Sequence, residues 1–589
     1  MGLNQFREEE LPYLINLFIT GNGPHRIRNQ ILAKAHELLH SRSGMEILYN
    51  HAPELDRHHF FSGTPWHDIR SLNPPLVRGT LEADTADSAA EVISNLRILA
   101  IALGAYSHHT VSPGEAQLYL DKVIALNIDL LFEKETEEAR VKQKGQRHPG
   151  RLMMEFITKR YSSLEVLNSI IEEIEKLEVQ RGITTAKIES LIYSGLEMLD
   201  KGRDCPEKFI KYAKAVSSRS ASFLTKEEFK MEALHCSKSM LDTGIVSASH
   251  VSLIQFINVQ YPDLLPDALG LTSWGRDNLQ KNIPLIKKLI TSAVTVDTKQ
   301  TVYALSRMLE RDILTDEMVS LLELLLITAP CSSVKHRLEL IYRNEKNADI
   351  HAHLVSGIIL VLGQPLGVGQ GYNPSCQSTR AISFWSQTDP VHLARLYLKA
   401  ISDNEISLFF EGSLLLSSQL RMEELNYSIP MDPVSIVLLP HLNALYGECL
   451  RLAGSRDEDP HKWVNPAFYG PGVLAGFADL HSCPSFLTLF YRYYHPASLE
   501  NIQRMLPQPA GILIYDRDEK ALGAHAILIQ RVAPDPEGNI RVYFYNPNND
   551  SSQVWGRDME VQVQGHGELP GEASLLYYHF TRCLYAFHY

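Results

Sequence analysis

The residues best suited to chemistry lie in a glycine-rich segment that ends at a cysteine. Residues 363–376 read GQPLGVGQGYNPSC, and the sequence QSTRAISFWSQ that follows predicts a helix opened by Cys376. A thiol at a helix N-terminus feels the positive end of the helix dipole, which favours the thiolate. Glycines before the thiol let the backbone approach a substrate closely. Cys376 is therefore the predicted nucleophile.

Two polar residues further along the chain are predicted to complete this site. His525 stands early in the apolar segment AHAILIQRV (524–532), and Asn546 ends the segment IRVYFYN (540–546). Adjacent antiparallel strands would set these two side chains beside each other. The amide would then hold the imidazole in one orientation and one tautomer without adding charge.

Together these motifs resemble the papain-like cysteine peptidase fold over residues 350–589. In that family a Gln-Gly pair begins six positions before the nucleophile and supplies an oxyanion-hole side chain, and Gln370 precedes Cys376 by six. The order Cys, His, Asn also matches. The turn that begins at Asn546 reads NPN and is similar to the DPN of YopT-like effector proteases and related bacterial transamidases. Papain itself has Trp where Gln377 follows the nucleophile, so the resemblance is to a distant relative.

The resemblance implies a thioester mechanism. Cys376 attacks an amide carbonyl, His525 moves the proton, Asn546 orients the ring, and Gln370 with the Cys376 N–H stabilises the oxyanion. The expected function is a thiol-dependent hydrolase that cleaves or modifies an amide bond of a protein or peptide. Two alternatives stay open: a glutamine deamidase or transglutaminase acting on a host protein, and a non-catalytic helical scaffold with a degenerate papain-like domain.

Other reactive side chains are weaker candidates. Cys483, in the sequence DLHSC, is the second-choice nucleophile. The pairs His351/His353 and His58/His59 have no carboxylate or cysteine at a metal-ligand spacing, so we interpret them as loop histidines. The sequence therefore predicts no metal and no cofactor.

Composition limits the possible partners and the compartment. The chain has 589 residues, of which 44% are hydrophobic, as in an ordinary globular protein. Its formal net charge of −13 disfavours wholesale binding to nucleic acid. Its seven scattered cysteines are typical of reduced thiols. It has no apolar run long enough to span a bilayer, and its N-terminus does not resemble a secretory signal. We expect a cytoplasmic protein, or an effector delivered into a host cell without a cleavable signal.

The elements that must position the site follow a helix-then-sheet order, which predicts an α+β protein. Residues 1–140 are predicted to form a helical domain containing a long loop at 52–87, and the charged stretch 134–151 an exposed linker. Residues 152–350 are predicted to form a helical bundle or irregular α-solenoid, and the helical N-terminal region as a whole is expected to dock the protein or peptide substrate. The predicted helices lie at 89–107, 115–134, 162–182, 186–200, 225–242, 283–294, 298–311 and 315–328.

Residues 351–589 are predicted to form the papain-like domain, with a helical part and an antiparallel sheet. Apolar alternation places strands at 510–518, 524–532, 540–548 and 559–565. The aromatic C-terminal run LLYYHFTRCLYAFHY predicts one final core strand.

Overall fold

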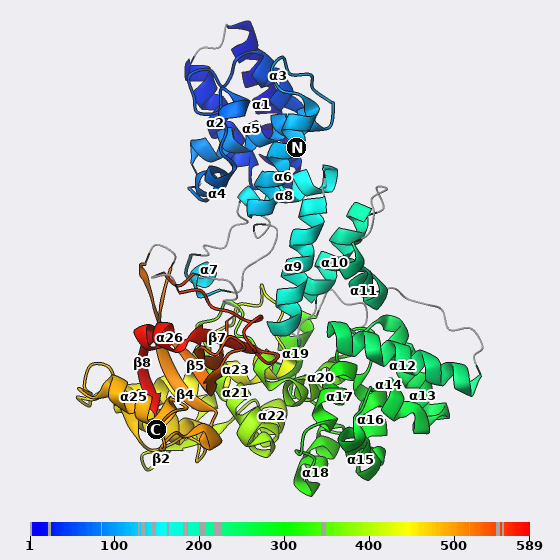
Figure 1. Ribbon diagram of the computed structural model, residues 1–589, viewed down its shortest axis with the longest axis vertical. Coiled ribbons are helices and arrows are strands. Elements are labelled where there is room, and N and C mark those ends of the chain that lie inside the picture. The colour runs from blue at the N-terminus through cyan, green and yellow to red at the C-terminus, as the bar shows by residue number, and fades with distance from the viewer. Residues whose placement is uncertain are drawn as a thin grey trace. The chain divides into compact units, whose positions relative to one another are not determined.

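The computed structural model of the 589-residue chain is mixed α+β (Figure 1). It describes residues 3–21, 25–83, 85–127, 130, 136–142, 149–161, 164–180, 183, 186–199, 206–216, 225–342, 349–516, 519–548, 554–556 and 559–589. None of the described helices combines the length and the apolarity needed to cross a bilayer.

The chain divides into two compact units, and both are discontinuous in sequence. The first comprises Met1–Lys134, Gln143–Glu173 and Tyr193–Pro206, and the second comprises Glu135–Lys142, Ile174–Ile192 and Glu207–Tyr589. These two discontinuous units do not correspond one to one to the three continuous domains predicted from the sequence. The predicted boundaries at 140 and 350 therefore remain predictions.

The first unit is helical and is organised around one buried helix. Helix α5 (Ala86–Ala102) is buried from Ser88 to Ala102, and a capping box between Thr85 and Ser88 fixes its start. The other helices of this unit are α1 (Leu3–Thr20), α2 (His25–Leu38), α3 (Arg42–Arg57), α4 (Pro74–Glu82), α6 (Pro113–Asn127) and α8 (Pro149–Arg160).

The second unit carries all the predicted site residues. Helices α9 (Leu164–Gln180) and α10 (Ala186–Leu199) divide between the two units. The helices wholly within the second unit are α7 (Glu137–Lys142), α11 (Glu207–Val216), α12 (Lys226–Thr243), α13 (Ala248–Gln260), α14 (Leu265–Ala268), α15 (Ser273–Lys281), α16 (Ile283–Ala293), α17 (Thr301–Leu309), α18 (Asp316–Leu325), α19 (Ser332–Ile341), α20 (Ile350–Gly363), α21 (Cys376–Thr388), α22 (Pro390–Asp403), α23 (Pro433–Ala453), α24 (His461–Tyr469), α25 (Phe486–Tyr494) and α26 (Tyr577–Cys583).

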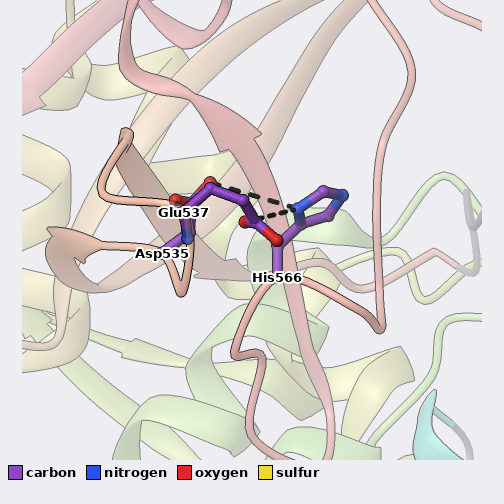
Figure 2. A group of neighbouring side chains, drawn as sticks. All are labelled: Asp535, Glu537 and His566. Atoms are coloured by element: carbon purple, nitrogen blue, oxygen red, sulfur yellow. Dashed lines mark hydrogen bonds and ion pairs between the residues drawn. The ribbon is translucent and has the colours of Figure 1, made fainter.

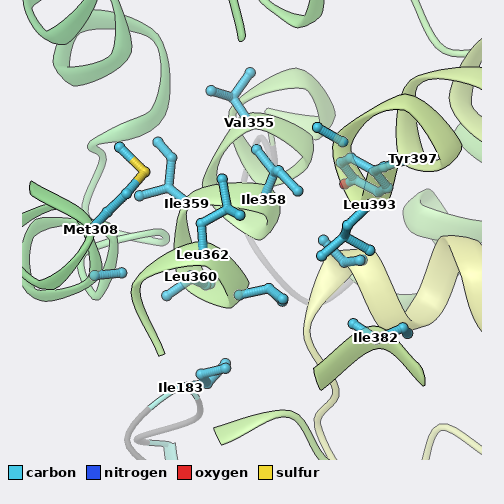
Figure 3. Packing of buried hydrophobic residues seen from close by; sticks show 14 of the residues in the cluster. Ile183, Met308, Val355, Ile358, Ile359, Leu360, Leu362, Ile382, Leu393 and Tyr397 are labelled. Atoms are coloured by element: carbon cyan, nitrogen blue, oxygen red, sulfur yellow. The ribbon is translucent and has the colours of Figure 1, made fainter. Parts of the chain in front are cut away.

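Helix α20 is the centre of the helical core of the second unit. It is buried continuously from Ala352 to Gly363, as expected for a helix that is apolar on every side. Gly363 lets α17 pack closely, since a Cβ at this position would lie 2.2 Å from the Ala304 carbonyl oxygen. Figure 3 shows side chains of α17, α20, α21 and α22 interlocking in this core, with Ile183 at its margin.

The main sheet is antiparallel and, in the described part of the chain, has six strands in the order β3-β8-β4-β5-β6-β7. The sheet contributes to two apolar clusters. Leu528 and Tyr545 pack in the helical core, whereas Ile527 and Ile529, which alternate with Leu528 along β5, pack in a second cluster. The strands are β3 (Phe477–Asp479), β4 (Gln508–Tyr515), β5 (Ala521–Pro534), β6 (Ile540–Tyr545), β7 (Glu572–Leu576) and β8 (Leu584–His588), with a separate hairpin of β1 (Ser407–Phe410) and β2 (Ser413–Leu416).

The α+β class and most predicted elements are confirmed, but the loop expected at 52–87 is confirmed only for residues 58–73 and is wrong at both ends. That stretch contains the end of α3, the whole of α4 and the start of α5. The prolines were misleading because Pro74 and Pro75 begin α4, where a missing backbone N–H costs nothing.

Two strand predictions near the C-terminus are also wrong. Residues 559–565 make only isolated bridges at Glu560 and Gln562, and β7 takes the place next to β6 instead. The aromatic C-terminal run divides into the end of β7, helix α26 and strand β8. Apolar composition alone does not reveal such a break, because helix and strand both use these residue types when buried.

Candidate active site

Cys376 is the first residue of α21, as the sequence predicted. Ser375 is the N-cap residue, and its side chain makes no capping hydrogen bond. The first N–H groups of a helix have no partner within the helix, so this end of α21 offers donors and a positive dipole end beside the thiol.

The loop before α21 is folded so that Gln370 lies next to the turn that carries Asn546. Gly371 has a φ of 57°, a left-handed conformation that favours glycine. The Asn373 amide donates to the Gln370 carbonyl at 3.0 Å, and the Gln370 N–H donates to the Pro547 carbonyl at 3.1 Å. The Gln370 side chain is buried, and its Oε1 accepts no hydrogen bond from the described residues.

His525 and Asn546 are brought together by the β5–β6 pairing. Leu528 of β5 is opposite Tyr545 of β6, so the two polar residues lie at the same end of the strand pair. His525 Nε2 lies 2.8 Å from Asn546 Oδ1. The Asn546 oxygen can only accept, so Nε2 carries the proton. The backbone N–H of Asn548 donates to the same oxygen at 3.0 Å and fixes its position.

Helix α21, which begins at Cys376, packs on β5, which carries His525, and the His525 side chain acts electrostatically on the thiol. Because Nε2 is engaged by Asn546, Nδ1 is the ring nitrogen that can exchange a proton with a thiol. Burial raises the pKa of Cys376, but the hydrogen bond and charge of His525, with the backbone N–H of Ala526, outweigh burial and lower the pKa overall. In contrast, burial raises the pKa of both Cys449 and Cys583 to about 12.

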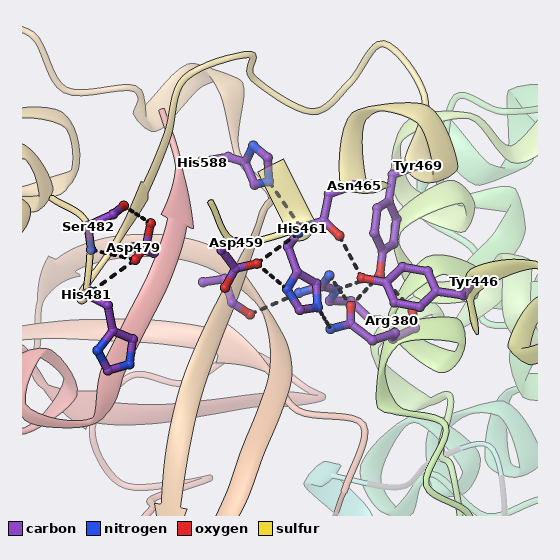
Figure 4. Close-up of polar contacts among 12 residues, drawn as sticks. Arg380, Tyr446, Asp459, His461, Asn465, Tyr469, Asp479, His481, Ser482 and His588 are labelled. Atoms are coloured by element: carbon purple, nitrogen blue, oxygen red, sulfur yellow. Dashed lines mark hydrogen bonds and ion pairs between the residues drawn. The ribbon is translucent and has the colours of Figure 1, made fainter. Parts of the chain in front are cut away.

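Arg380, one turn after Cys376 on α21, ties this helix to the sheet. Its buried guanidinium donates to the carbonyl of Ala510 on β4 at 3.0 Å and to that of Ile527 on β5 at 3.3 Å. It also donates to the Tyr469 hydroxyl at 2.9 Å. Figure 4 shows the surrounding network, in which His461 links Asp459 to the Gln377 amide. These contacts set the helix of the thiol against the strand of the imidazole.

Helix α7 lies within the stretch expected to be an exposed linker, and that expectation is wrong for Thr136, Glu137 and Glu138. All three are buried, and α7 packs on β5. The Glu137 carboxylate accepts from Arg140 Nε at 3.0 Å and from the Asn548 side-chain amide. Polar residues bury when partners satisfy their charge, and a local sequence window does not show such partners.

The weaker sequence candidates serve other purposes. Asp479 accepts from the backbone N–H groups of His481 at 3.0 Å and Ser482 at 2.8 Å, so it stabilises the turn that precedes Cys483 (Figure 4). His353 is buried and stacks on Tyr342 with ring centroids 3.8 Å apart, which makes it a core residue rather than the expected loop histidine.

The described residues contain one three-residue group with metal-ligating atoms, formed by Asp535, Glu537 and His566 (Figure 2). His566 Nδ1 lies 4.0 Å from Asp535 Oδ2 and 3.7 Å from Glu537 Oε2. Asp535 Oδ1 accepts from the backbone N–H groups of Glu537 and Asn539, and Arg541 lies 3.9 Å from Oδ2. The hydrogen bonds of the turn and the nearby Arg541 explain why Asp535 is buried with its charge. We therefore assign this three-residue group a structural role.

Comparisons with protein-family models, curated proteins and solved structures found no match. The geometry of the site therefore carries the functional argument. The sequence predicted Cys376, His525, Asn546 and Gln370; the structure joins His525 to Asn546 and the Gln370 backbone to Pro547, and it adds Glu137 and Arg380, which were missed. The only sequence signal for Arg380 is its position four residues after Cys376, on the same face of a predicted helix.

Proposed function

We propose that this protein is a thiol-dependent enzyme that breaks amide bonds of a protein or peptide through a thioester at Cys376. The observation that carries the proposal is the hydrogen bond between His525 and Asn546 on the strand against which the helix of Cys376 packs; in support, His525 lowers the pKa of the Cys376 thiol. A papain-like fold for this region stays a proposal that rests on the same residues.

The arrangement supports a sequence of balanced steps. His525 Nδ1 takes the thiol proton, and Sγ attacks the carbonyl carbon to give a tetrahedral oxyanion. The proton passes to the leaving nitrogen, the C–N bond breaks, and a thioester forms. Water, deprotonated by His525, then attacks the thioester to give a carboxylic acid and the free thiol. Each oxyanion donor would supply about 3 kcal/mol, and the Cys376 N–H and the Gln370 amide are the proposed donors.

The thiol chemistry is tested by labelling with an alkyne-bearing iodoacetamide, followed by peptide mapping. Labelling near neutral pH should be concentrated at Cys376, vanish in Cys376→Ala, fall in His525→Ala and persist in Gln370→Ala. Cys483→Ala is the matched control and should label as the parent does. Equal labelling of Cys376 and Cys483, or no effect of His525→Ala, would contradict the proposal.

A second reaction, glutamine deamidation or transamidation, is favoured by one observation. A glutamate carboxylate, the product of glutamine hydrolysis, is held near the reactive pair, since the Glu137 charge interacts with both His525 and Cys376. In this reaction the side-chain amide releases ammonia, and water or an amine resolves the thioester.

Mass spectrometry of treated proteomes separates the reactions, with Cys376→Ala as the blank. Proteolysis creates new termini, and transamidation incorporates an added primary amine. Deamidation converts Gln to Glu and adds the mass difference between NH and O. The helical region before residue 350 stays the proposed dock for the protein target.

A further inference from the structure

Helix α7 takes an unusual path through the molecule. The chain before it, to Lys134, and after it, from Gln143, belongs to the first compact unit, whereas Glu135–Lys142 belongs to the second. Helix α7 thus packs on β5, the strand that carries His525, while the neighbouring chain segments are assigned to the other unit. Such an excursion costs chain entropy at both connections, so the contacts that α7 makes must offset that cost.

Glu137 makes contacts that join α7 to the turn after β6. Its carboxylate accepts from the Asn548 Nδ2 amide, and Arg140 Nε lies 3.0 Å from both carboxylate oxygens. The Asn548 backbone N–H also donates to Asn546 Oδ1. Asn548 therefore contacts both Glu137 and Asn546, the residue that orients His525. Glu137 is 6% exposed and Asn548 is 1% exposed, so neither group exchanges its partner for water.

With α7 in place, the imidazole and its amide partner are buried, whereas Cys376 is partly exposed. His525 is 1% exposed, and Asn546 is 2% exposed. In the proposed mechanism His525 protonates the leaving nitrogen, so a polypeptide substrate must come within hydrogen-bonding distance of the His525 ring. Helix α7 packs on the strand of His525, although the chain segments on either side of it belong to the first unit.

We infer that α7 is an internal ligand of this site: Glu137 fills the position in which Asn548 receives the carboxylate or amide side chain of a substrate, and turnover requires α7 to leave. The inference rests on the proposed function. It specifies the substrate as a peptide segment with Glu or Gln at the recognised position, and it makes the resting enzyme autoinhibited.

Access to the thiol tests this inference with two reagents of different size. The full chain is alkylated at Cys376 with iodoacetamide and, separately, with a maleimide carrying a long polyethylene glycol chain. Glu137→Ala should raise the ratio of the maleimide rate to the iodoacetamide rate by about tenfold, because it removes hydrogen bonds to a buried charge. Glu137→Gln keeps the size and an acceptor oxygen, and should change the ratio less.

Glu155→Ala is the matched control, because it removes ion pairs to Arg42 and Arg151 on the next helix, α8, in the first unit, and should leave the ratio unchanged. Far-UV circular dichroism establishes that each variant is folded. An unchanged ratio in Glu137→Ala, with Cys376 still reactive toward iodoacetamide, would overturn the inference and leave the proposed function intact. An unreactive Cys376 in every form would overturn both.

A peptide arm tests the recognised side chain. The peptide of residues 134–143, KETEEARVKQ, is added to the Glu137→Ala protein at about 1 mM, which matches the effective concentration of a tethered segment. It should slow alkylation of Cys376, and the same peptide with Ala for Glu137 should not. In Asn548→Ala/Glu137→Ala the protection should be lost. Equal protection by both peptides would refute recognition of Glu137 by Asn548.

Discussion

At the scale of single residues, the reactivity of Cys376 depends on a balance between burial and one imidazole. Burial alone raises a thiol pKa, as it does for Cys449 and Cys583. At Cys376 the interaction of the thiol with the His525 side chain reverses the direction of the pKa shift. The difference between an inert and a reactive cysteine therefore lies in a single neighbouring side chain.

This balance predicts the pH dependence of alkylation. The thiolate is the reactive form, so a lowered pKa shifts the midpoint of the rate of Cys376 labelling below the usual thiol value. In His525→Ala the effect of burial, which raises the pKa of Cys376, is no longer outweighed. The midpoint of Cys376 labelling should therefore move to higher pH. Rates of iodoacetamide labelling measured between about pH 5 and pH 10 test this.

Cys449 and Cys583 are internal controls for the same experiment. Because burial raises the pKa of each to about 12, neither should label near neutral pH while the protein is folded. A Cys376 midpoint that stays the same in His525→Ala would show that the imidazole does not control the thiol.

At the scale of elements, α21 and β5 act together because Arg380 joins them. The helix supplies the thiol and the strand supplies the imidazole, and the guanidinium bonds to carbonyls of β4 and β5. A planar guanidinium donates in several fixed directions, so it holds the helix in one position relative to the sheet.

Replacing Arg380 with Met should therefore affect both stability and reactivity. The loss of several charged hydrogen bonds should lower the free energy of unfolding by about 3 kcal/mol. The selective labelling of Cys376 should fall with it, because the thiol and imidazole are no longer held in register. Urea denaturation and thiol labelling measure the two effects.

Arg395→Met is the matched control for this substitution. Arg395 forms an ion pair with Glu317 in which both side chains are more than half exposed, so its loss should change stability by at most about 0.5 kcal/mol. If Arg380→Met behaves like Arg395→Met, the network around α21 does not position the site.

At the scale of the whole molecule, the second unit is assembled from distant parts of the chain. Ile183, between α9 and α10, is buried in the same core as α20 and α21, and it packs on Gly367 (Figure 3). The Gly571 N–H donates to the Val179 carbonyl at 2.8 Å. Residues 174–192 are thus structural parts of the unit that carries the thiol.

Ile183→Ala should consequently destabilise the unit that carries Cys376. Truncation of a buried Ile costs about 3 kcal/mol through lost burial and the remaining cavity. Urea denaturation followed by exposure of the buried Cys449 thiol reports on this unit. Ile327→Ala, at a position 80% exposed, is the control and should leave the midpoint nearly unchanged. Equal midpoints for the two variants would show that residues 174–192 are dispensable.

The sequence predicted the helical elements well where apolar periodicity was strong, as at residues 164–180. It failed at both ends of 52–87 and at the C-terminus, where proline and aromatic residues suit several structures equally. Burial of residues 136–138 was not predictable, because their partners on β5 and after β6 stand about four hundred residues away in the chain.

By itself, the sequence determined which residues were available for chemistry: Cys376 at a helix start, His525 in one strand, and Asn546 after the next. Local spacing and strand alternation are properties of neighbouring residues, so they can be read along the chain. Only the tertiary structure decided that Arg380 joins helix to sheet and that Glu137 is seated near the thiol. Charge pairing and burial depend on distances between segments that are remote in sequence, and those distances are fixed only when the chain folds.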